Sequence, residues 1–407
     1  MQVLYPCCAG LDVHKKTVVA CARRQVRNKI EQQVETFATT TSGLLGLLEW
    51  LYEHDCTHVA MEATGVYWKP VWHVLEGSFE LILANACHVK AVPGRKSDVN
   101  DAMWLADLLA HGLLQPSFVP PRPIQELRDL TRTHRQFLRE RVRHVQRIQK
   151  LLEDACLKIA DLVSDLLGNS GRAILDALVA GESDPERLAD LGWRLRKSTR
   201  EERIEALRGR CTDHHRYLIG LHLRHIDAIN DSIGALETRI DEMMEPFREA
   251  EALLCTIPGV AKTMAHTVIA ELGTEMSRFP TSGHLVSWVG LCPRQDESAG
   301  KRRSTRIRKG ASWLKAALVQ AAWGAVRTKS YFRAQFYRIR ARRGPKKAIV
   351  AVAASLLTVI YHILRDGVPY HDLGYDHFNQ LDKGKSARRL IRRLTELGYD
   401  VDIQEAA

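Results

Sequence analysis

The sequence lacks several features that would assign it to common classes of protein. Its nine cysteines are spread along 407 residues without a Cys-x-x-Cys pair, which argues against a zinc ribbon or a dithiol redox motif. An odd number of scattered thiols is typical of a reducing cytoplasm. The sequence also contains no Gly-x-x-x-x-Gly-Lys-Ser/Thr motif, so we expect no P-loop nucleotide site.

Long hydrophobic stretches are equally scarce. Residues 1–6 have neither a basic start nor an apolar core, so we expect no signal peptide. The longest apolar run, residues 348–364, contains Ser355, Thr358 and His362. It is shorter than the ~20 residues that span a bilayer. We therefore predict that this run forms a buried helix.

Positive charge is present in excess. Lysine and arginine number 59 against 48 acidic residues, which gives a formal net charge of +11. This balance favours a polyanionic partner, and nucleic acid ahead of a membrane surface. A chain of 407 residues can bury a large core and form several domains. We divide it into segments 1–120, 121–250 and 251–370 and a basic tail, 371–407.

Segment 1–120 alternates between strand and helix patterns. Strands are predicted at 7–12, 17–22, 34–39, 58–63 and 81–86, and helices at 42–52, 66–75 and 98–110. A meander followed by alternating strands and helices predicts a mixed sheet covered by helices. Because the remaining segments show mainly helical patterns, the predicted fold class is α/β plus α.

Carboxylates stand at the ends of several predicted elements. Asp12 ends the first strand, Glu62 ends the fourth, and Asp98 and Asp101 open the last helix. The three-residue step places the last two on one helix face, about 5–6 Å apart at Cβ. An N-cap and a first-turn acid would explain that pair alone. Apolar strands that each end in an isolated acid suggest convergence at one sheet edge, which favours a site for a divalent cation.

Segment 121–250 carries two long amphipathic patterns. One runs without interruption from Gln125 to Leu166 and the other from His214 to Phe247. Together they predict an antiparallel coiled coil that also serves as an oligomer contact. The other face of the first helix is basic, with Arg128, Arg132, Arg135, Arg139, Arg141, Arg143, Arg147 and Lys150. Such a face is either solvated or in contact with phosphate, and the excess of arginine favours phosphate.

Segment 251–370 begins with a short turn between helices. Residues 257–262 read Ile-Pro-Gly-Val-Ala-Lys, a pattern similar to a helix-hairpin-helix, whose backbone amides cradle a phosphate. An ordinary helix–helix corner would show the same pattern. Further along, Ser298 precedes a stretch in which six of the nine residues 301–309 are Lys or Arg. A serine becomes a nucleophile only where its alkoxide is stabilised, so chemistry alone indicates an ordinary loop serine.

Three motifs together resemble a known family. They are Gly-Leu-Asp-Val-His-Lys at 10–15, Met-Glu-Ala-Thr-Gly at 61–65 and Lys-Ser-Asp-Val-Asn-Asp-Ala at 96–102. They are similar to those of insertion-sequence transposases of the Piv-invertase kind, and the resemblance extends over nearly the whole chain. It implies a RuvC-like, RNase H-type domain in which Asp12, Glu62, Asp98 and Asp101 form a DEDD quartet that binds one or two Mg²⁺ ions.

The resemblance also implies a function. Members of this family are recombinases guided by a bridge RNA, so it implies a cytoplasmic prokaryotic enzyme that moves an insertion sequence between donor and target DNA. In the family, a serine after Gly-Leu-x-Pro is the recombination nucleophile, and Ser298 matches it in the C-terminal serine transposase domain. Ala299 separates Ser298 from Gly300, which leaves Ser304 as an alternative. A dimer or tetramer with carboxylates from one subunit and serine from another is implied as well.

Residues near these motifs are the predicted nucleic-acid contacts. They are Lys15, Arg95, Lys96, Arg135, Arg139, Gly259, Lys262, Lys301, Arg302, Arg303, Arg306, Arg308 and Lys309. Two other functions remain open. A metal-dependent nuclease or Holliday-junction resolvase would use water as its nucleophile. A non-catalytic scaffold would bind RNA or DNA without need of the acids, although converging carboxylates would repel a polyanion.

Overall fold

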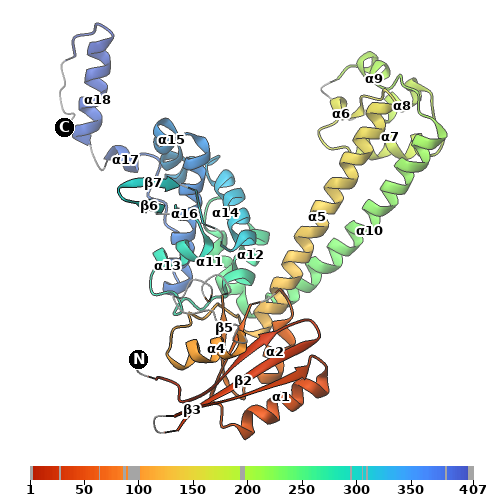
Figure 1. Cartoon of the computed structure of the whole chain (residues 1–407). Helices are drawn as coiled ribbons and strands as arrows, with labels where there is room; N and C mark the ends of the chain where they lie inside the picture. The colour runs from red at the N-terminus through yellow and green to blue at the C-terminus, as the bar shows by residue number, and fades with distance from the viewer. Residues whose placement is uncertain are drawn as a thin grey trace. The chain divides into compact units, whose positions relative to one another are not determined.

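The computed structural model describes residues 3–26, 29–63, 65–85, 89, 101–192, 198–293, 296–304, 306–308, 310–380 and 383–401. The chain divides into two compact units, Met1–Val119 and Pro120–Ala407, which are described one at a time (Figure 1). The boundary lies at the predicted proline-rich junction. The finer division of the second unit into three segments stays a prediction.

The first unit is built on a mixed sheet of five strands in the order β3-β2-β1-β4-β5. Its elements are β1 Cys7–Val13, β2 Thr17–Val26, β3 Lys29–Ala38, α1 Thr41–Glu53, β4 His58–Glu62, α2 Trp68–Leu75, β5 Glu80–Ala84 and α4 Asp101–Ala110. The first three strands form an antiparallel meander, whereas β4 and β5 run parallel to β1. The predicted mixed sheet is confirmed.

Helices cover both faces of this sheet. Side chains alternate along β1, so Leu11 packs with α1 and α2 while Cys8 packs with Leu105 of α4. Gly10 faces α4 as well, and a Cβ there would lie 2.2 Å from the carbonyl oxygen of Ala102. Because only glycine permits this approach, the start of α4 lies directly against β1.

The second unit is mostly helical. Its elements are α5 Arg122–Asp154, α6 Ile159–Leu162, α7 Asn169–Val179, α8 Pro185–Leu191, α9 Arg200–Ala206, α10 Asp213–Met243, η1 Glu245–Phe247, α11 Arg248–Cys255, α12 Lys262–Leu272, α13 Ser282–Val289, β6 Asp296–Ser298, β7 Lys301–Ser304, α14 Ser312–Ala325, α15 Tyr331–Arg343, α16 Pro345–Asp366, α17 His377–Gln380 and α18 Lys383–Glu396. The predicted combination of an α/β region with a mostly helical C-terminal region is confirmed.

Helices α5 and α10 lie side by side and run antiparallel (Figure 1). His134 lies 3.0 Å from Glu237 and His215 lies 2.9 Å from Asp154, so residue numbers rise along one helix as they fall along the other. The winding of a coiled coil stays a prediction.

The first of these helices is shorter than predicted. The apolar pattern from Gln125 to Leu166 predicts one uninterrupted helix. In the structure, α5 ends at Asp154. Cys156 has a φ of +60°, which a right-handed helix does not allow. The apolar residues beyond it belong to the separate core of the insert between α5 and α10, with Ile159 and Leu166 among its buried members.

Helix α16 forms the centre of the C-terminal helices. By length and composition it is the one helix in the described part of the chain that could cross a membrane. Its side chains Val352, Leu356 and Ile360 are fully buried, and it packs against α11, α13, α14 and α15. The prediction of a buried helix at 348–364 is confirmed.

Candidate active site and nucleic-acid interface

Two of the predicted carboxylates lie at the carboxyl ends of neighbouring parallel strands. Leu11 of β1 is paired with Met61 of β4, so Asp12 and Glu62 are the next residues in register. Adjacent strands lie about 4.8 Å apart. The strand pairing therefore places these two acids next to each other along the same sheet edge.

Asp12 and Glu62 also point toward helix α4. Gly10 and Ala60, two residues earlier on each strand, face α4, and alternation puts the two acids on that face too. Asp101 is the first residue of α4, next to the residue whose carbonyl lies against Gly10. Three predicted carboxylates thus belong to one face of the sheet.

These acids suit a divalent cation by chemistry, although they do not enclose one. No three of the described His, Cys, Asp or Glu side chains are grouped closely enough to hold an ion. Asp98, like Arg95 and Lys96, lies outside the described residues. Carboxylate oxygens are the ligands that Mg²⁺ prefers, and Asp12 and Asp101 supply them from two elements that pack together.

His14 contacts Asp12, and the sequence patterns do not predict this contact. Its Nε2 lies 3.0 Å from Oδ2 of Asp12, and the His14 side chain is 60% exposed against 22% for Asp12. A polar residue two positions further along the same strand edge could have signalled this contact. Lys15 follows in the exposed turn between β1 and β2.

A half-buried ion pair anchors the other end of α4. The Arg23 side chain is fully buried, and its Nε donates to Oδ1 of Asp107 at 2.7 Å. Arg23 belongs to β2 and Asp107 to α4. Together with the Gly10 contact, the pair determines how α4, and therefore Asp101, lies on the sheet.

Ser298 ends strand β6 of a hairpin, which corrects the expectation of a loop. It pairs with Lys301 across a two-residue turn, in which Ala299 and Gly300 have φ of +50° and +73°. Such a turn matches the twist of the flanking strands, although the left-handed conformation costs an alanine about 1 kcal/mol. Ser304 ends the other strand, so the two candidate serines belong to opposite strands of one hairpin.

The basic residues of this hairpin and of the chain just after it are exposed wherever their side chains are described. These are Lys301, Arg306 and Arg308. Arg302 and Arg303 belong to strand β7, and Lys309 lies outside the described residues. The main chain therefore brings positive charge to the strand that follows the serine turn, whereas the strand before the turn carries Asp296 and Glu297.

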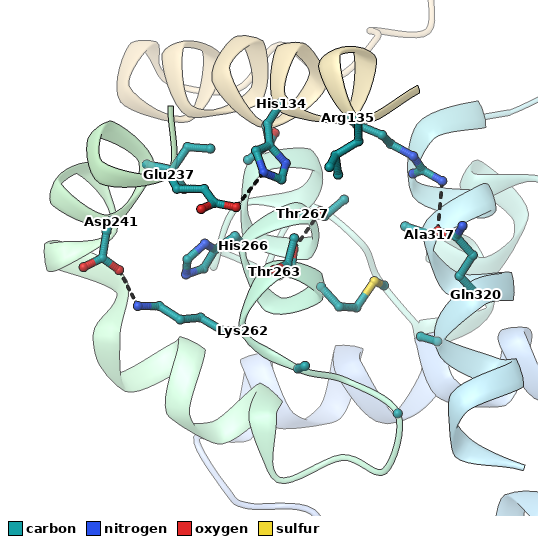
Figure 2. A pocket seen from close by; sticks show the side chains of 17 residues that line it. His134, Arg135, Glu237, Asp241, Lys262, Thr263, His266, Thr267, Ala317 and Gln320 are labelled. Carbon is teal, nitrogen blue, oxygen red and sulfur yellow. Dashed lines mark hydrogen bonds and ion pairs between the residues drawn. The ribbon is translucent and has the colours of Figure 1, made fainter. Parts of the chain in front are cut away.

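A cavity of about 720 Å³ lies among α5, α10, α12 and α14 (Figure 2). It is lined by three predicted nucleic-acid contacts, Arg135, Gly259 and Lys262. Figure 2 shows Lys262 directed toward Asp241, with which it forms an ion pair. Arg135 donates to Oε1 of Gln320 at 3.2 Å, and burial lowers its pKa. Both cations have partners within the protein.

The turn at Gly259 packs against α14. Gly259 has a φ of +83°, and a Cβ there would lie 2.3 Å from the carbonyl oxygen of Ala321. Helix α12 then begins at Lys262, and its N-cap, Ala261, provides no side-chain hydrogen bond. The arrangement is two helices joined by a tight turn, and phosphate binding by a helix-hairpin-helix stays a prediction.

The start of the basic face of α5 is used for contacts within the second unit. Arg132 binds the carboxylate of Glu271 through two hydrogen bonds of 2.7 and 2.8 Å, and the Glu271 side chain is 3% exposed. Arg128 donates to the Glu271 carbonyl at 2.9 Å. Arg139 lies 5.2 Å from the centre of the Trp313 ring. These arginines hold α5 against α12 and α14.

Two family models match the sequence over regions that include these sites. One, described as a transposase of the DEDD type, matches residues 9–157, and the other, described as the transposase IS116/IS110/IS902 family, matches residues 251–338. The matches define the class of this protein, which is a transposase, an enzyme of DNA recombination. More particularly, the chain belongs to the IS110 family of insertion-sequence transposases.

Similar curated proteins include both invertases and insertion-element proteins. A pilin gene-inverting protein of Moraxella bovis is 24% identical over 89% of this chain and 96% of its own length. The insertion element IS900 uncharacterized 42 kDa protein of Mycobacterium paratuberculosis is 25% identical over 72% of this chain and 80% of its own. An uncharacterized 43.6 kDa protein of insertion element IS110 from Streptomyces coelicolor is 28% identical over 36% of each chain. The class implies DNA as substrate, and the DEDD domain suggests a divalent metal cofactor.

Proposed function

We propose that this transposase is an RNA-guided recombinase that cuts and rejoins DNA through a phosphoserine intermediate. The observation that carries the proposal is the placement of Asp12, Glu62 and Asp101 on one face of the first sheet, in a chain whose second unit holds Ser298 in a basic hairpin. Guidance by a structured RNA is supported by the family resemblance and by the net charge of +11.

The proposed cofactor is Mg²⁺, held by the acids already described together with Asp98. When bound, it would polarise the scissile phosphate and stabilise the charge that develops there. Oγ of Ser298 loses its proton and attacks phosphorus, and the bond from phosphorus to the 3′ oxygen of the DNA breaks. That oxygen takes up a proton and becomes a free 3′ hydroxyl. Lys301 and Arg306 supply positive charge beside the reacting phosphate.

Rejoining is the reverse of this attack with a new partner strand. A 3′ hydroxyl of the second DNA attacks the phosphoserine, a phosphodiester forms, and Ser298 is released with its proton restored. The phosphoserine bond replaces one phosphodiester and is itself replaced by another. The reaction therefore needs no nucleotide hydrolysis, which agrees with the missing P-loop motif.

Trapping of the covalent intermediate tests the proposal. End-labelled cognate DNA, guide RNA and Mg²⁺ are incubated with the protein, the adduct is resolved on a denaturing gel, and its site is located by mass spectrometry. We expect an adduct at Ser298 in the wild type and in Ser304→Ala, and none in Ser298→Ala. Asp12→Asn and Asp101→Asn should bind DNA but form no adduct.

Three results would contradict parts of this proposal. An adduct that persists in Ser298→Ala and disappears in Ser304→Ala would identify Ser304 as the nucleophile. Hydrolysed, unjoined ends without any adduct would identify a nuclease or resolvase that uses water. Adduct formation that is unchanged without the RNA would remove RNA guidance from the proposal.

A further inference from the structure

Residues 323–347, here called the basic segment, have an unusual charge pattern. The segment contains nine lysine and arginine residues and no acidic residue. It covers the end of α14, all of α15 and the start of α16. None of the nine cations forms an ion pair with a carboxylate in the described part of the chain. A surface of uncompensated cations attracts a polyanion.

Within the basic segment lies a groove of about 540 Å³ that has aromatic walls. Trp323 and Tyr337 line it and are 45% and 44% exposed. The Trp323 ring meets the buried ring of Phe336 edge-on, with 5.6 Å between centroids. Phe336 therefore supports Trp323 from the core side and leaves much of the indole open to a ligand. We call this feature the Trp323 groove.

Arginines line the same groove. Arg333 and Arg340 lie 5.8 and 5.7 Å from the centre of the Tyr337 ring. Arg333 also donates to the backbone carbonyl of Arg327 at 3.3 Å. Cations placed over an aromatic ring polarise it and stay available to an anion. The groove thus combines flat apolar faces with positive charge at spacings of a few ångströms.

This combination matches the chemistry of an unpaired nucleotide. A base presents a flat face that stacks on an aromatic side chain, and its phosphates pair with arginine. Duplex DNA offers the phosphates, but its base faces are covered by stacking within the helix. An acidic peptide offers charge without flat rings. Of these ligands, single-stranded nucleic acid alone uses both properties of the groove.

We propose that the Trp323 groove binds single-stranded DNA, with an unpaired base stacked on Trp323 and adjacent phosphates bound by Arg327 and Arg340. The inference rests on the proposed function, because strand exchange between two DNA molecules requires a strand to leave its duplex. DNA is also the substrate of the transposase class. The groove holds a strand that has been freed from its partner, separately from the chemistry at Ser298.

Binding to a fluorescent oligonucleotide tests this proposal. The probe is a 12-nucleotide single-stranded DNA with 2-aminopurine at its centre, added to full-length Ser298→Ala protein without Mg²⁺. Stacking on the indole should quench the probe, and Trp323→Ala should lose the quench and bind about ten-fold more weakly. Trp323→Phe should keep affinity within about three-fold, since a ring still stacks. Tyr217→Ala, which removes a tyrosine that is 65% exposed on α10, is the matched control and should bind normally.

Several outcomes would overturn the proposal. These are unchanged binding by Trp323→Ala with an unchanged melting temperature, tighter binding of the duplex or of RNA of the same sequence, and equal competition by polyglutamate. The binding assay is independent of the trapping experiment, because the Ser298→Ala protein cannot form the phosphoserine adduct. Normal adducts with failed groove binding would contradict this inference alone, and normal groove binding without adducts would contradict the proposed function alone.

Discussion

Arginines in two parts of the second unit carry the same charge in different surroundings. In the insert, Arg172 binds Asp227 through hydrogen bonds of 2.6 and 2.8 Å, and Arg200 lies 2.9 Å from Asp190. In the basic segment, none of the described cations has a carboxylate partner. An arginine that is paired with a carboxylate stabilises the fold, whereas an unpaired arginine can bind a polyanion. The presence of a partner therefore matters more than the number of basic residues.

Helix α5 shows both kinds of surroundings along one face. Its predicted phosphate contacts include Arg132, which is bound to buried Glu271, and Arg143, which is exposed. The sequence pattern does not distinguish them, since both occupy the same polar side of an amphipathic helix. Substitutions that break pairs should therefore change stability, and substitutions of unpaired arginines should change binding.

The largest effect is expected from Arg132→Ala. The change leaves the Glu271 carboxylate buried, with its 3.8 Å contact to Arg128 as the remaining ion pair, and breaking a buried pair costs about 3 kcal/mol. Chemical denaturation should show the loss, with single-stranded DNA binding unchanged. The matched control is Arg122→Ala, which breaks an exposed pair on the same helix and should leave stability unchanged. Equal losses in both variants would show that burial of the pair does not matter.

Arg340→Ala should affect binding and leave stability alone. Arg340 lies over Tyr337 and has no carboxylate partner among the described residues. Removing one phosphate contact should weaken single-stranded DNA binding about three- to five-fold and reduce the salt slope by about 0.7. Anisotropy titrations at several salt concentrations measure both. Arg200→Ala, a paired arginine, should bind as the wild type does. A similar loss in Arg200→Ala would indicate that net charge alone controls binding.

Arg172→Ala should have a smaller effect on stability than Arg132→Ala. Its two carboxylate partners, Asp176 and Asp227, are about half exposed, so water replaces much of what the pair supplies. A bidentate surface pair contributes about 1 kcal/mol, measurable by denaturation. Asp227→Asn should lose a similar amount. A loss as large as that of Arg132→Ala would contradict the role assigned to burial.

The smallest effect on stability is expected from a change of pH. His144 and His222 face each other across α5 and α10, with Nδ1 atoms 3.2 Å apart. Burial lowers the pKa of both, and nearby Arg147 lowers it further. His225 on α10 also lowers both, while Glu140 on α5 raises the pKa of His144.

The sign of this pH dependence follows from proton binding. Below the ordinary histidine pKa of about 6.5, the unfolded chain takes up protons that the folded helix pair does not. The free energy of unfolding should therefore stay constant above pH 6.5 and fall as the pH decreases below that value. Melting temperatures at pH 7.5 and 5.5 measure the fall, which should be shallower in His222→Gln. A melting temperature that rises on acidification would contradict the lowered pKa values.

Much of the first unit was predictable from local patterns. The strand that starts at Cys7 and the helix around Leu47 were predicted in type and close to their observed bounds. Asp12 and Glu62 were recognisable as strand-end acids because each is an isolated carboxylate near the end of an apolar strand. Their shared face depended on the parallel register of β1 and β4, which no local pattern contains.

In the second unit, local patterns failed where the chain changes direction. Apolar residues recur at helical spacing past Asp154, although the helix ends there. The residues beyond the turn keep that spacing because they bury their side chains in a separate core. The hairpin at Ser298 was also missed, since Ala299 is a poor signal for a turn of positive φ.

By itself, the sequence determined the types of most elements, the identity of the candidate acids and serine, and the net positive charge, because periodicity and composition are local or additive properties. Only the tertiary structure decided which acids share a face, which cations have partners and where an aromatic ring remains open beside arginine. Those properties depend on residues far apart in the chain, whose separation in space is set by packing.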